Sequence, residues 1–474
     1  MFDISRKTKI IATIGPSSEN EKIIADLIRA GVNIFRFNMK HNDIKWHRKQ
    51  IKKVQKIADK LKTPIGIMID LQGPEIRLKT KNKKNINVKE GMKITLGENT
   101  HSNDIAISKN TIFNIVKPGD SIFIDDGIVE LKVIDKKGKT ITAKVINNGI
   151  IKDQKTINIP EKNIDGPSLI KDDLTKLDRL TKSKVDFIAL SFCRTKDDIQ
   201  NLRGELKKRK IEANIVAKIE TRESINNIDK IIKSADAIMV ARGDLGLEIP
   251  IEEIAYWQRL IIEKCRISKK PVIVATQMLH SMTKNPRPTR AEVTDVANAV
   301  FNGTDAVMLS EETAAGHYPV KSVTEMAKIL EFNEKKIEMV PPIKYQITNS
   351  TEFIISSAMS MINQKHNIKI DGIIILTETG YTARAVSSFR PNIKTIAVTD
   401  NQKTIEKLTL SYGIVSVKAP FPSGDFCSPE KIDPILKKLK NQGLIQKGEK
   451  VIVIHGRQFK KSGLTNTLSL IQIK

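Results

Sequence analysis

Short apolar runs alternate with amphipathic segments through most of the first 340 residues, and this alternation constrains the fold more than any other feature. An apolar run of four to seven residues between helix-like segments is typical of a buried parallel strand. Eight such runs predict a (β/α)₈ barrel. The alternative, a doubly wound open sheet, lacks an early dinucleotide-binding fingerprint. The predicted strands are 9–14, 34–39, 65–71, 186–192, 215–220, 237–244, 271–277 and 306–310.

The rhythm changes twice. Residues 77–160 show period-two strands and turns, including a hairpin of 129–135 with 140–147, which predicts a small all-β domain inserted into the barrel. A new α/β series begins near residue 340, with a helix at 350–366 and a strand at 372–376. We therefore expect an α/β chain in which a barrel carries an inserted β lid and is followed by an open-sheet α/β domain. The expected boundaries are 1–77 and 161–342 for the barrel, 78–160 for the lid and 343–474 for the last domain.

Composition narrows the class of protein. The three cysteines, Cys193, Cys265 and Cys427, show no metal-binding spacing, which favours a reducing, cytoplasmic location. No apolar segment is long enough to span a membrane, and Met1 to Lys9 do not resemble a signal peptide. The formal net charge of +26 allows nucleic-acid binding, but the excess lysine is spread along the chain without interleaved aromatic residues. We expect neither a nucleic-acid nor a membrane partner.

Two predicted strands end in charged residues. Lys218 and Glu220 follow one apolar run, and Asp244 follows the next. These positions lie at the carboxyl ends of the strands, where barrel enzymes carry their active sites. Two carboxylates suit Mg²⁺, and the lysine offers a cation to an anionic substrate. The alternative is a structural salt bridge of Lys218 with one of the carboxylates.

Polar residues follow most of the other predicted strands as well. A nearly complete ring of cations, carboxylates and hydroxyls at one barrel mouth favours a metal and phosphate site over isolated salt bridges. The remaining members of this ring are Arg36, Asn38, Asp70, Ser191, Arg194, Thr276, Gln277, Ser310, Glu311 and Glu312.

A capping box marks one further helix. Thr289 and Glu292 stand at the spacing of an N-cap residue and its partner, and Arg287 and Arg290 lie beside them. This helix start is suited to an anion. An ordinary capped helix at an interface has the same pattern.

A hydroxyl-rich turn lies between strand and helix in the last domain. Such a turn resembles a phosphate cradle and is a candidate effector site, although a plain capped helix start explains it too. Its residues are Thr377, Thr379, Gly380 and Thr382, and Arg457, Lys460 and Lys461 in a later loop offer additional cations.

Several motifs together resemble the pyruvate kinase family over the whole chain. They are KIIATIGP at 9–16, DLQGPEIR at 70–77, AKIE at 217–220, MVARGDLG at 239–246, ATQML at 275–279 and PRPTRAE at 286–292. The resemblance implies a barrel, a β lid after the third barrel strand and a C-terminal α/β domain. It also implies a homotetramer that transfers the phosphoryl group of phosphoenolpyruvate to ADP, giving pyruvate and ATP.

The resemblance assigns roles to individual residues. Glu220 and Asp244 are expected to hold Mg²⁺ or Mn²⁺, Lys218 to stabilise the transferring phosphoryl group and the enolate, and Arg36 to grip the phosphoryl group. Thr276 and Ser310 are candidates for the proton path. The expected substrate-binding residues also include Ala241, Arg242 and Gly243, and the expected nucleotide-binding residues are Asn38, Arg77 and Lys155.

The monovalent-cation site departs from the family pattern. Lys40 stands where many members have a serine that ligates K⁺, and Leu71 stands where many K⁺-using members have threonine, whereas Glu75 matches the K⁺-using pattern. One hypothesis is that the Lys40 ammonium replaces K⁺ beside Asn38 and Asp70. The alternative is that Lys40 points to solvent and K⁺ still binds.

The effector turn departs too. Tyr381 stands where some members carry a basic effector-binding residue, so control by a sugar bisphosphate is not expected, whereas another phosphorylated effector remains open.

Two rival functions remain at this point. Another Mg²⁺-dependent barrel enzyme acting on phosphoenolpyruvate or a 2-keto acid, such as an aldolase, shares the Glu and Asp pattern but needs no β lid. A non-catalytic nucleotide-binding descendant is expected to lose Lys218, Glu220 or Asp244, and all three are present.

Overall fold

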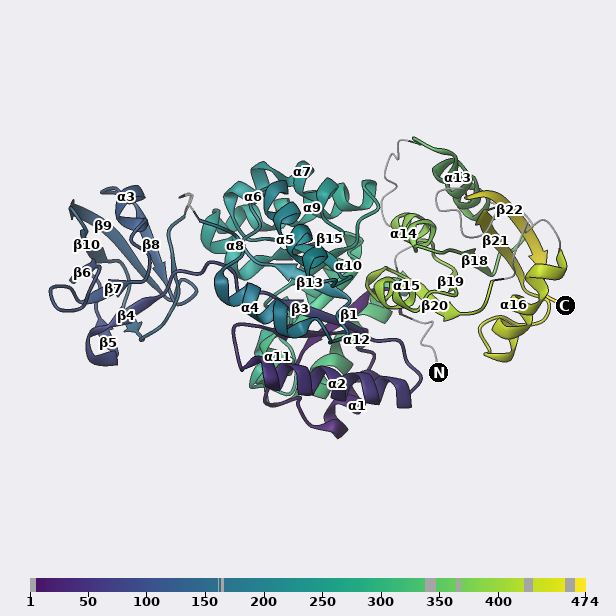
Figure 1. Cartoon of the computed structure of the whole chain (residues 1–474), viewed down its shortest axis with the longest axis horizontal. Helices are drawn as coiled ribbons and strands as arrows, with labels where there is room; N and C mark the ends of the chain where they lie inside the picture. Colours follow the sequence, from purple (N-terminus) through teal and green to yellow (C-terminus); the bar gives the residue numbers. More distant parts are fainter. Residues whose placement is uncertain are drawn as a thin grey trace.

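The chain forms three bodies in a row (Figure 1). The computed structural model describes residues 6–160, 162, 166–336, 347–363, 368–421, 429–456 and 465–474. The β lid lies at one end, the barrel in the middle and the C-terminal α/β domain at the other end. The expected boundary at 342/343 lies outside the described residues, as do Arg457, Lys460, Lys461 and Cys427.

The central body is a closed barrel of eight parallel strands, as predicted. The strands follow one another around the barrel in chain order, and β17 closes on β1 through the register Lys9↔Ala306. The strands are β1 (Lys9–Thr13), β2 (Ile34–Asn38), β3 (Gly66–Asp70), β13 (Phe187–Leu190), β14 (Asn214–Ile219), β15 (Ala237–Ala241), β16 (Val272–Ala275) and β17 (Ala306–Leu309).

Helices surround this barrel, so both faces of its strands are buried. One set of strand side chains, including Ile11, Met68 and Met239, fills the barrel interior. The alternate set, including Ile10, Ile69 and Val240, packs against the helices. The helical segments are α1 (Glu21–Arg29), α2 (Ile44–Lys60), α4 (Lys171–Leu180), α5 (Lys196–Lys208), α6 (Arg222–Asn226), α7 (Ile228–Ser234), α8 (Arg242–Glu248), 251–253, α9 (Ile254–Ile267), 280–283, α10 (Arg290–Phe301), α11 (Glu311–Ala314) and α12 (Pro319–Lys336).

The lid is inserted between β3 and β13 and has its own apolar core. A seven-stranded sheet and a two-stranded sheet form it, and the predicted hairpin is present as β9 paired with β10. An antiparallel bridge between Arg77 and Thr156 joins the start of the lid to the residue before its last strand. Its elements are β4 (Leu78–Thr80), 81–83, β5 (Ile86–Val88), β6 (Lys93–Gly97), β7 (Ile105–Ile107), α3 (Ile112–Ile115), β8 (Ser121–Ile124), β9 (Val129–Lys137), β10 (Thr140–Val145), β11 (Gly149–Ile151) and β12 (Ile157–Asn158).

The C-terminal domain is an open five-stranded sheet of order β20-β19-β18-β21-β22, in which only β22 is antiparallel among the described strands. Figure 1 shows α14 and α15 on the side that faces the barrel. The elements are α13 (Ser350–Asn363), β18 (Gly372–Leu376), α14 (Tyr381–Ser388), β19 (Lys394–Thr399), α15 (Gln402–Lys407), 408–410, β20 (Ile414–Lys418), α16 (Pro429–Asn441), β21 (Lys450–Gly456) and β22 (Thr465–Gln472).

One local prediction from the sequence is confirmed and another is wrong. The capping box of α10 is confirmed, because the Thr289 side chain accepts from the Glu292 N–H while the Glu292 carboxylate accepts from the Thr289 N–H. The predicted strand 237–244 is too long, because pairing with β16 ends at Ala241 and α8 begins at once. Asp244 thus lies in the first turn of a helix, where a carboxylate is favourable.

Among the helices described, none has the length and apolarity needed to cross a bilayer.

Candidate active site

Lys218 is the centre of a buried ionic cluster at the barrel mouth. Its ammonium lies 2.7 Å from Glu220 Oε1, 2.8 Å from Ser191 Oγ and 3.3 Å from Asp70 Oδ1. Burial works against the charged lysine, but Asp70, Glu220 and Asp244 outweigh it and raise the lysine pKa. The sequence predicts a cluster of charged residues at the strand ends here. The structure shows such a cluster, and its residues come from the ends of three neighbouring strands.

Asp70 joins Arg36 to this cluster. Both Arg36 Nε and Nη2 lie 2.7 Å from Asp70 Oδ2, and Nη1 donates to Thr13 Oγ1 at 3.1 Å. Burial alone favours protonated Asp70, yet Lys218 and Arg36 hold the pKa of this carboxyl at about 2. The site therefore presents two fixed cations that share one carboxylate, which suits a highly charged phosphoryl group.

Glu220 and Asp244 suit a divalent metal. Burial and repulsion by Asp244 raise the pKa of Glu220 to about 7 against the attraction of Lys218. Two carboxylates that repel each other are favoured by a cation between them. No larger His, Cys, Asp or Glu cluster that could hold a metal occurs in the described part of the chain. A site of two carboxylates leaves metal positions for water and substrate oxygens, as Mg²⁺ prefers.

Thr276 is held in an unusual backbone conformation beside α8. Its φ is 70°, a left-handed value that is costly for a β-branched residue. Its hydroxyl accepts from the Gly243 N–H at 2.9 Å, and its carbonyl accepts from Arg242 Nη2 at 2.6 Å. Asp295 fixes Arg242 through two bonds of 2.7 Å. The hydroxyl thus lies over the start of α8, beside the residue that precedes Asp244.

Ser310 follows β17, as the sequence predicted. Its N–H donates to the buried carboxylate of Glu312 at 2.7 Å, and the same carboxylate accepts from the Leu279 N–H at 3.2 Å. Glu312 therefore ties the loops after β16 and β17 together.

The lid and the barrel enclose a cleft of about 240 Å³. Thr156 to Asn158 line it from the lid, and Phe192, Arg194 and Asp244 line it from the barrel. The cleft therefore reaches Asp244, one of the two carboxylates that the sequence predicts as metal ligands.

The expected nucleotide residues stand near the base of the lid. Arg77 Nη1 donates to the Gln154 carbonyl at 2.9 Å, and Lys155 forms a 2.7 Å ion pair with Asp125. Arg77 thus lies where the chain enters the lid, and Lys155 lies between the lid strands β11 and β12.

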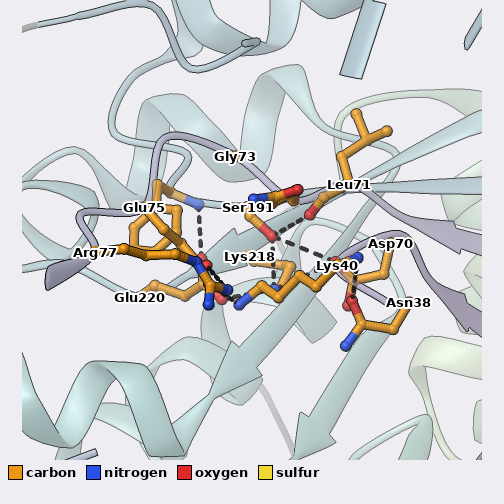
Figure 2. Close-up of polar contacts among 12 residues, drawn as sticks. Asn38, Lys40, Asp70, Leu71, Gly73, Glu75, Arg77, Ser191, Lys218 and Glu220 are labelled. Carbon is orange, nitrogen blue, oxygen red and sulfur yellow. Dashed lines mark hydrogen bonds and ion pairs between the residues drawn. The ribbon is translucent and has the colours of Figure 1, made fainter. Parts of the chain in front are cut away.

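Lys40 reaches from the loop after β2 toward the barrel mouth (Figure 2). Its ammonium forms an ion pair with Glu75, whose other oxygen lies 2.7 Å from Arg77 Nη2. The Lys40 N–H donates to Asn38 Oδ1 at 3.1 Å. Leu71 is buried and contributes its carbonyl, which accepts from Ser191 Oγ at 2.7 Å. The structure brings Lys40 into the site rather than to solvent.

The candidate effector turn is ordered by its own hydroxyls. Gly380 has a φ of 78°, and its N–H donates to Thr377 Oγ1 at 3.0 Å. The Thr382 hydroxyl lies 2.8 Å from that of Thr465. Thr379 contributes its carbonyl to Arg384 at 3.3 Å. An effector role for this turn stays a prediction.

Three residues that shape the site were given no role from the sequence. Ser191 belongs to the predicted ring but was not expected to bond Lys218. Asp173 accepts from the Gln72 and Gly73 N–H groups at 3.0 and 3.1 Å and so orders the loop after β3. Asp295 lies on α10, and nothing in its local sequence distinguishes it from a solvent-facing helix residue.

A closed parallel barrel whose charged groups gather at the carboxyl ends of its strands defines a barrel enzyme. Comparison with known protein families identifies the family of this barrel enzyme. The family model described as pyruvate kinase, barrel domain, matches residues 5–323, and that of the pyruvate kinase alpha/beta domain matches residues 352–471. The chain belongs to the pyruvate kinase family, glycolytic phosphotransferases that transfer a phosphoryl group from phosphoenolpyruvate to ADP.

Individual relatives are similar to this chain along nearly all of its length. A pyruvate kinase of Clostridium acetobutylicum is 40% identical, with 98% of this chain and 99% of the relative covered. A pyruvate kinase of Geobacillus stearothermophilus is 37% identical, with 98% and 80% covered. The crystal structure of a pyruvate kinase from Cryptosporidium parvum superposes with a TM-score of 0.90 at 34% identity, covering 99% and 97% of the two chains.

Proposed function

We propose that this chain carries out the family's phosphoryl transfer at the Lys218 cluster. The observation that carries the proposal is the shared carboxylate of Asp70, which holds Lys218 and Arg36 on one side of the barrel mouth. Phosphoryl transfer depends on positioning and on neutralising charge, and two buried cations supply both. Arg36 grips the phosphoryl group, and Lys218 neutralises the charge that develops on the phosphoryl and enolate oxygens.

Glu220 and Asp244 are the proposed Mg²⁺ ligands. A metal held there would neutralise negative charge on the substrate. Within the protein, Phe192 N–H donates to Glu220 Oε2 at 2.6 Å and so orients this carboxylate. The Lys218 ion pair orients its other oxygen. Supported ligands of this kind are expected to bind with defined geometry.

The substrate carboxylate is proposed to lie over the start of α8, between Ala241 and Asp244, with the Thr276 hydroxyl beside it. In the present arrangement the Gly243 N–H bonds to that hydroxyl, so the substrate has to replace this bond. Thr276 and Ser310 are the proposed path of the proton to the enolate carbon. Their support is position at the ends of β16 and β17.

The nucleotide is proposed to bind between lid and barrel, near Asn38, Arg77 and Lys155. Arg77 lies where the chain enters the lid, and Lys155 lies just before the last lid strand. Closure of the lid therefore brings them toward a bound nucleotide and excludes water. Membership of the family also supports a homotetramer, which sedimentation would test.

Lys40 is proposed to replace K⁺. The residues here fit K⁺ poorly, because Leu71 has no side-chain oxygen and Glu75 already binds Lys40 and Arg77. The Asn38 side-chain oxygen accepts from the Lys40 backbone. The ammonium of Lys40 supplies one positive charge at the place where a monovalent cation is needed.

The test is pyruvate formation from phosphoenolpyruvate and ADP with Mg²⁺, with K⁺ or with tetramethylammonium at equal ionic strength. Equal turnover with either cation is the expected result. No turnover in either condition would overturn the catalytic proposal. Turnover only with K⁺ would keep the enzyme and overturn the proposal for Lys40.

A further inference from the structure

A small cavity lies between the barrel and the C-terminal domain, at the opposite end of the barrel from the active site. Lys269, Lys270 and Pro271 line it at the amino end of β16, and Arg384 of α14 and Ser411 line it from the C-terminal domain. Its volume is about 10 Å³, so it has room for no more than one small species.

The charge around this cavity is unbalanced. Asp305 is the lone carboxylate among the described residues that line it. Asp305 already pairs with Arg390 at 2.7 Å, and Lys269 pairs with Glu352. The cationic residues of the lining are Arg266, Lys269, Lys270, Arg384 and Arg390.

Two of these cations, Lys270 and Arg384, form no ion pair among the described residues. Lys270 Nζ donates to the Ala235 carbonyl at 2.6 Å, and Arg384 Nη1 donates to the Thr379 carbonyl at 3.3 Å. Neither forms an ion pair with a carboxylate of the described chain. Their charges therefore face the cavity with hydrogen bonds to neutral groups only.

The pKa shifts agree with this imbalance. Burial lowers the pKa of Lys270, and repulsion by Arg384 and Arg203 lowers it further, against attraction by Asp236. Burial also lowers the pKa of Arg384, against attraction by Asp236 and Tyr381. An anion in the cavity would relieve the cost of both buried charges.

A buried hydroxyl gives an independent indication of a ligand. The Ser411 side chain lines the cavity, its residue is 1% exposed, and its Oγ has no hydrogen-bond partner in the described structure. Ser387, also in the lining, already donates to the Tyr412 carbonyl at 2.8 Å. Buried polar groups are almost always paired, so the Ser411 hydroxyl points to a partner in the cavity.

We propose that this cavity is a binding site for a monatomic inorganic anion, chloride, held by Lys270, Arg384 and the Ser411 hydroxyl. The anion fastens the C-terminal domain to the barrel, because its ligands come from both. A water molecule would satisfy Ser411 but would add no negative charge beside the two cations. The proposal is independent of the catalytic assignment, since the site lies at the other end of the barrel.

Two measurements on the full chain test it. Crystals grown in sodium bromide are expected to show an anomalous peak between Lys270, Arg384 and Ser411. The Tm is expected to be about 2 °C higher in sodium chloride than in sodium acetate at equal ionic strength. Arg384→Gln and Ser411→Ala are each expected to lose this chloride advantage.

Lys403→Gln is the matched control, because it also removes a cation from the barrel-facing side of the C-terminal domain, and Lys403 pairs with Glu212 outside the cavity. It is expected to keep the chloride advantage. A bromide peak that persists in Arg384→Gln would mark an adventitious ion only and overturn the proposal. Absence of the peak in the parent, or equal Tm in the two salts, would overturn it without any variant.

Discussion

The carboxylate of Glu75 holds the Lys40 ammonium in an ion pair at the mouth of the barrel. This relationship makes a direct prediction for Lys40→Ser. Removing the ammonium leaves Glu75 with a charge that a solvent cation can balance, so the variant is expected to be activated about tenfold by K⁺, a gain of about 1.4 kcal/mol in transition-state stabilisation. The measurement is turnover against K⁺ concentration for parent and variant. Lys45→Ser, an exposed lysine on α2, is the control, and equal K⁺ response of the parent and Lys40→Ser would contradict the prediction.

Lys218→Gln tests the centre of the site. The substitution removes the cation that faces Asp70 and Glu220 and is proposed to face the substrate, and kcat is expected to fall by roughly 10³-fold. Steady-state kinetics would measure the loss, with circular dichroism to confirm that the variant is folded. Lys230→Gln removes an exposed lysine from α7 and is expected to leave kcat unchanged. A loss of less than tenfold in Lys218→Gln would count against the assigned role.

Asp295→Asn tests the support of Thr276. Without its charge, Asp295 binds Arg242 less tightly, and Arg242 in turn anchors the strained Thr276 backbone. We expect kcat/KM for phosphoenolpyruvate to fall about tenfold or more, because small displacements of positioned groups are costly. Asp229→Asn breaks a comparable exposed ion pair with Lys264 and is expected to have no kinetic effect. Unchanged kinetics in Asp295→Asn would show that Thr276 needs no such anchor.

Asp186 and Glu406 predict a pH dependence of stability. Asp186 precedes β13, Glu406 lies on α15, and burial together with repulsion by Glu406 raises the pKa of Asp186 to about 7. Because an unfolded aspartate titrates near pH ~3.9, the folded state binds more protons between about pH 4 and 7. The contribution of this pair to the free energy of unfolding therefore falls as the pH rises through that window. Above about pH 7 this contribution stays constant.

Asp186→Asn removes that titration. The variant is expected to be more stable than the parent by about 2 kcal/mol at pH 7.5, and the advantage is expected to shrink toward pH 4.5. Denaturant unfolding at a series of pH values measures it. The control is Asp59→Asn on the exposed face of α2. A constant difference between Asp186→Asn and the parent at all pH values would contradict the prediction.

The barrel and the charged ends of its strands were predictable because both are local features. An apolar run such as 215–217 ends where Lys218 begins, and parallel strands bring such ends together. Asp244 was predicted to end a strand although it lies in the first turn of a helix, because the apolar pattern alone does not fix where strand pairing stops. Bonds such as Asp295 to Arg242 join residues 53 positions apart, so no local pattern reveals them.

The Arg77–Thr156 bridge also bears on how the chain folds. β3 and β13 are neighbours in the barrel although the whole lid lies between them in the chain. A lid that folds first around its own core brings its two ends together. Pairing β3 with β13 then costs only the entropy of closing a short loop, instead of a loop as long as the whole lid. The rate at which the barrel closes should then follow the stability of the lid, with the inserted domain acting as a folding clamp for the enzyme that it covers.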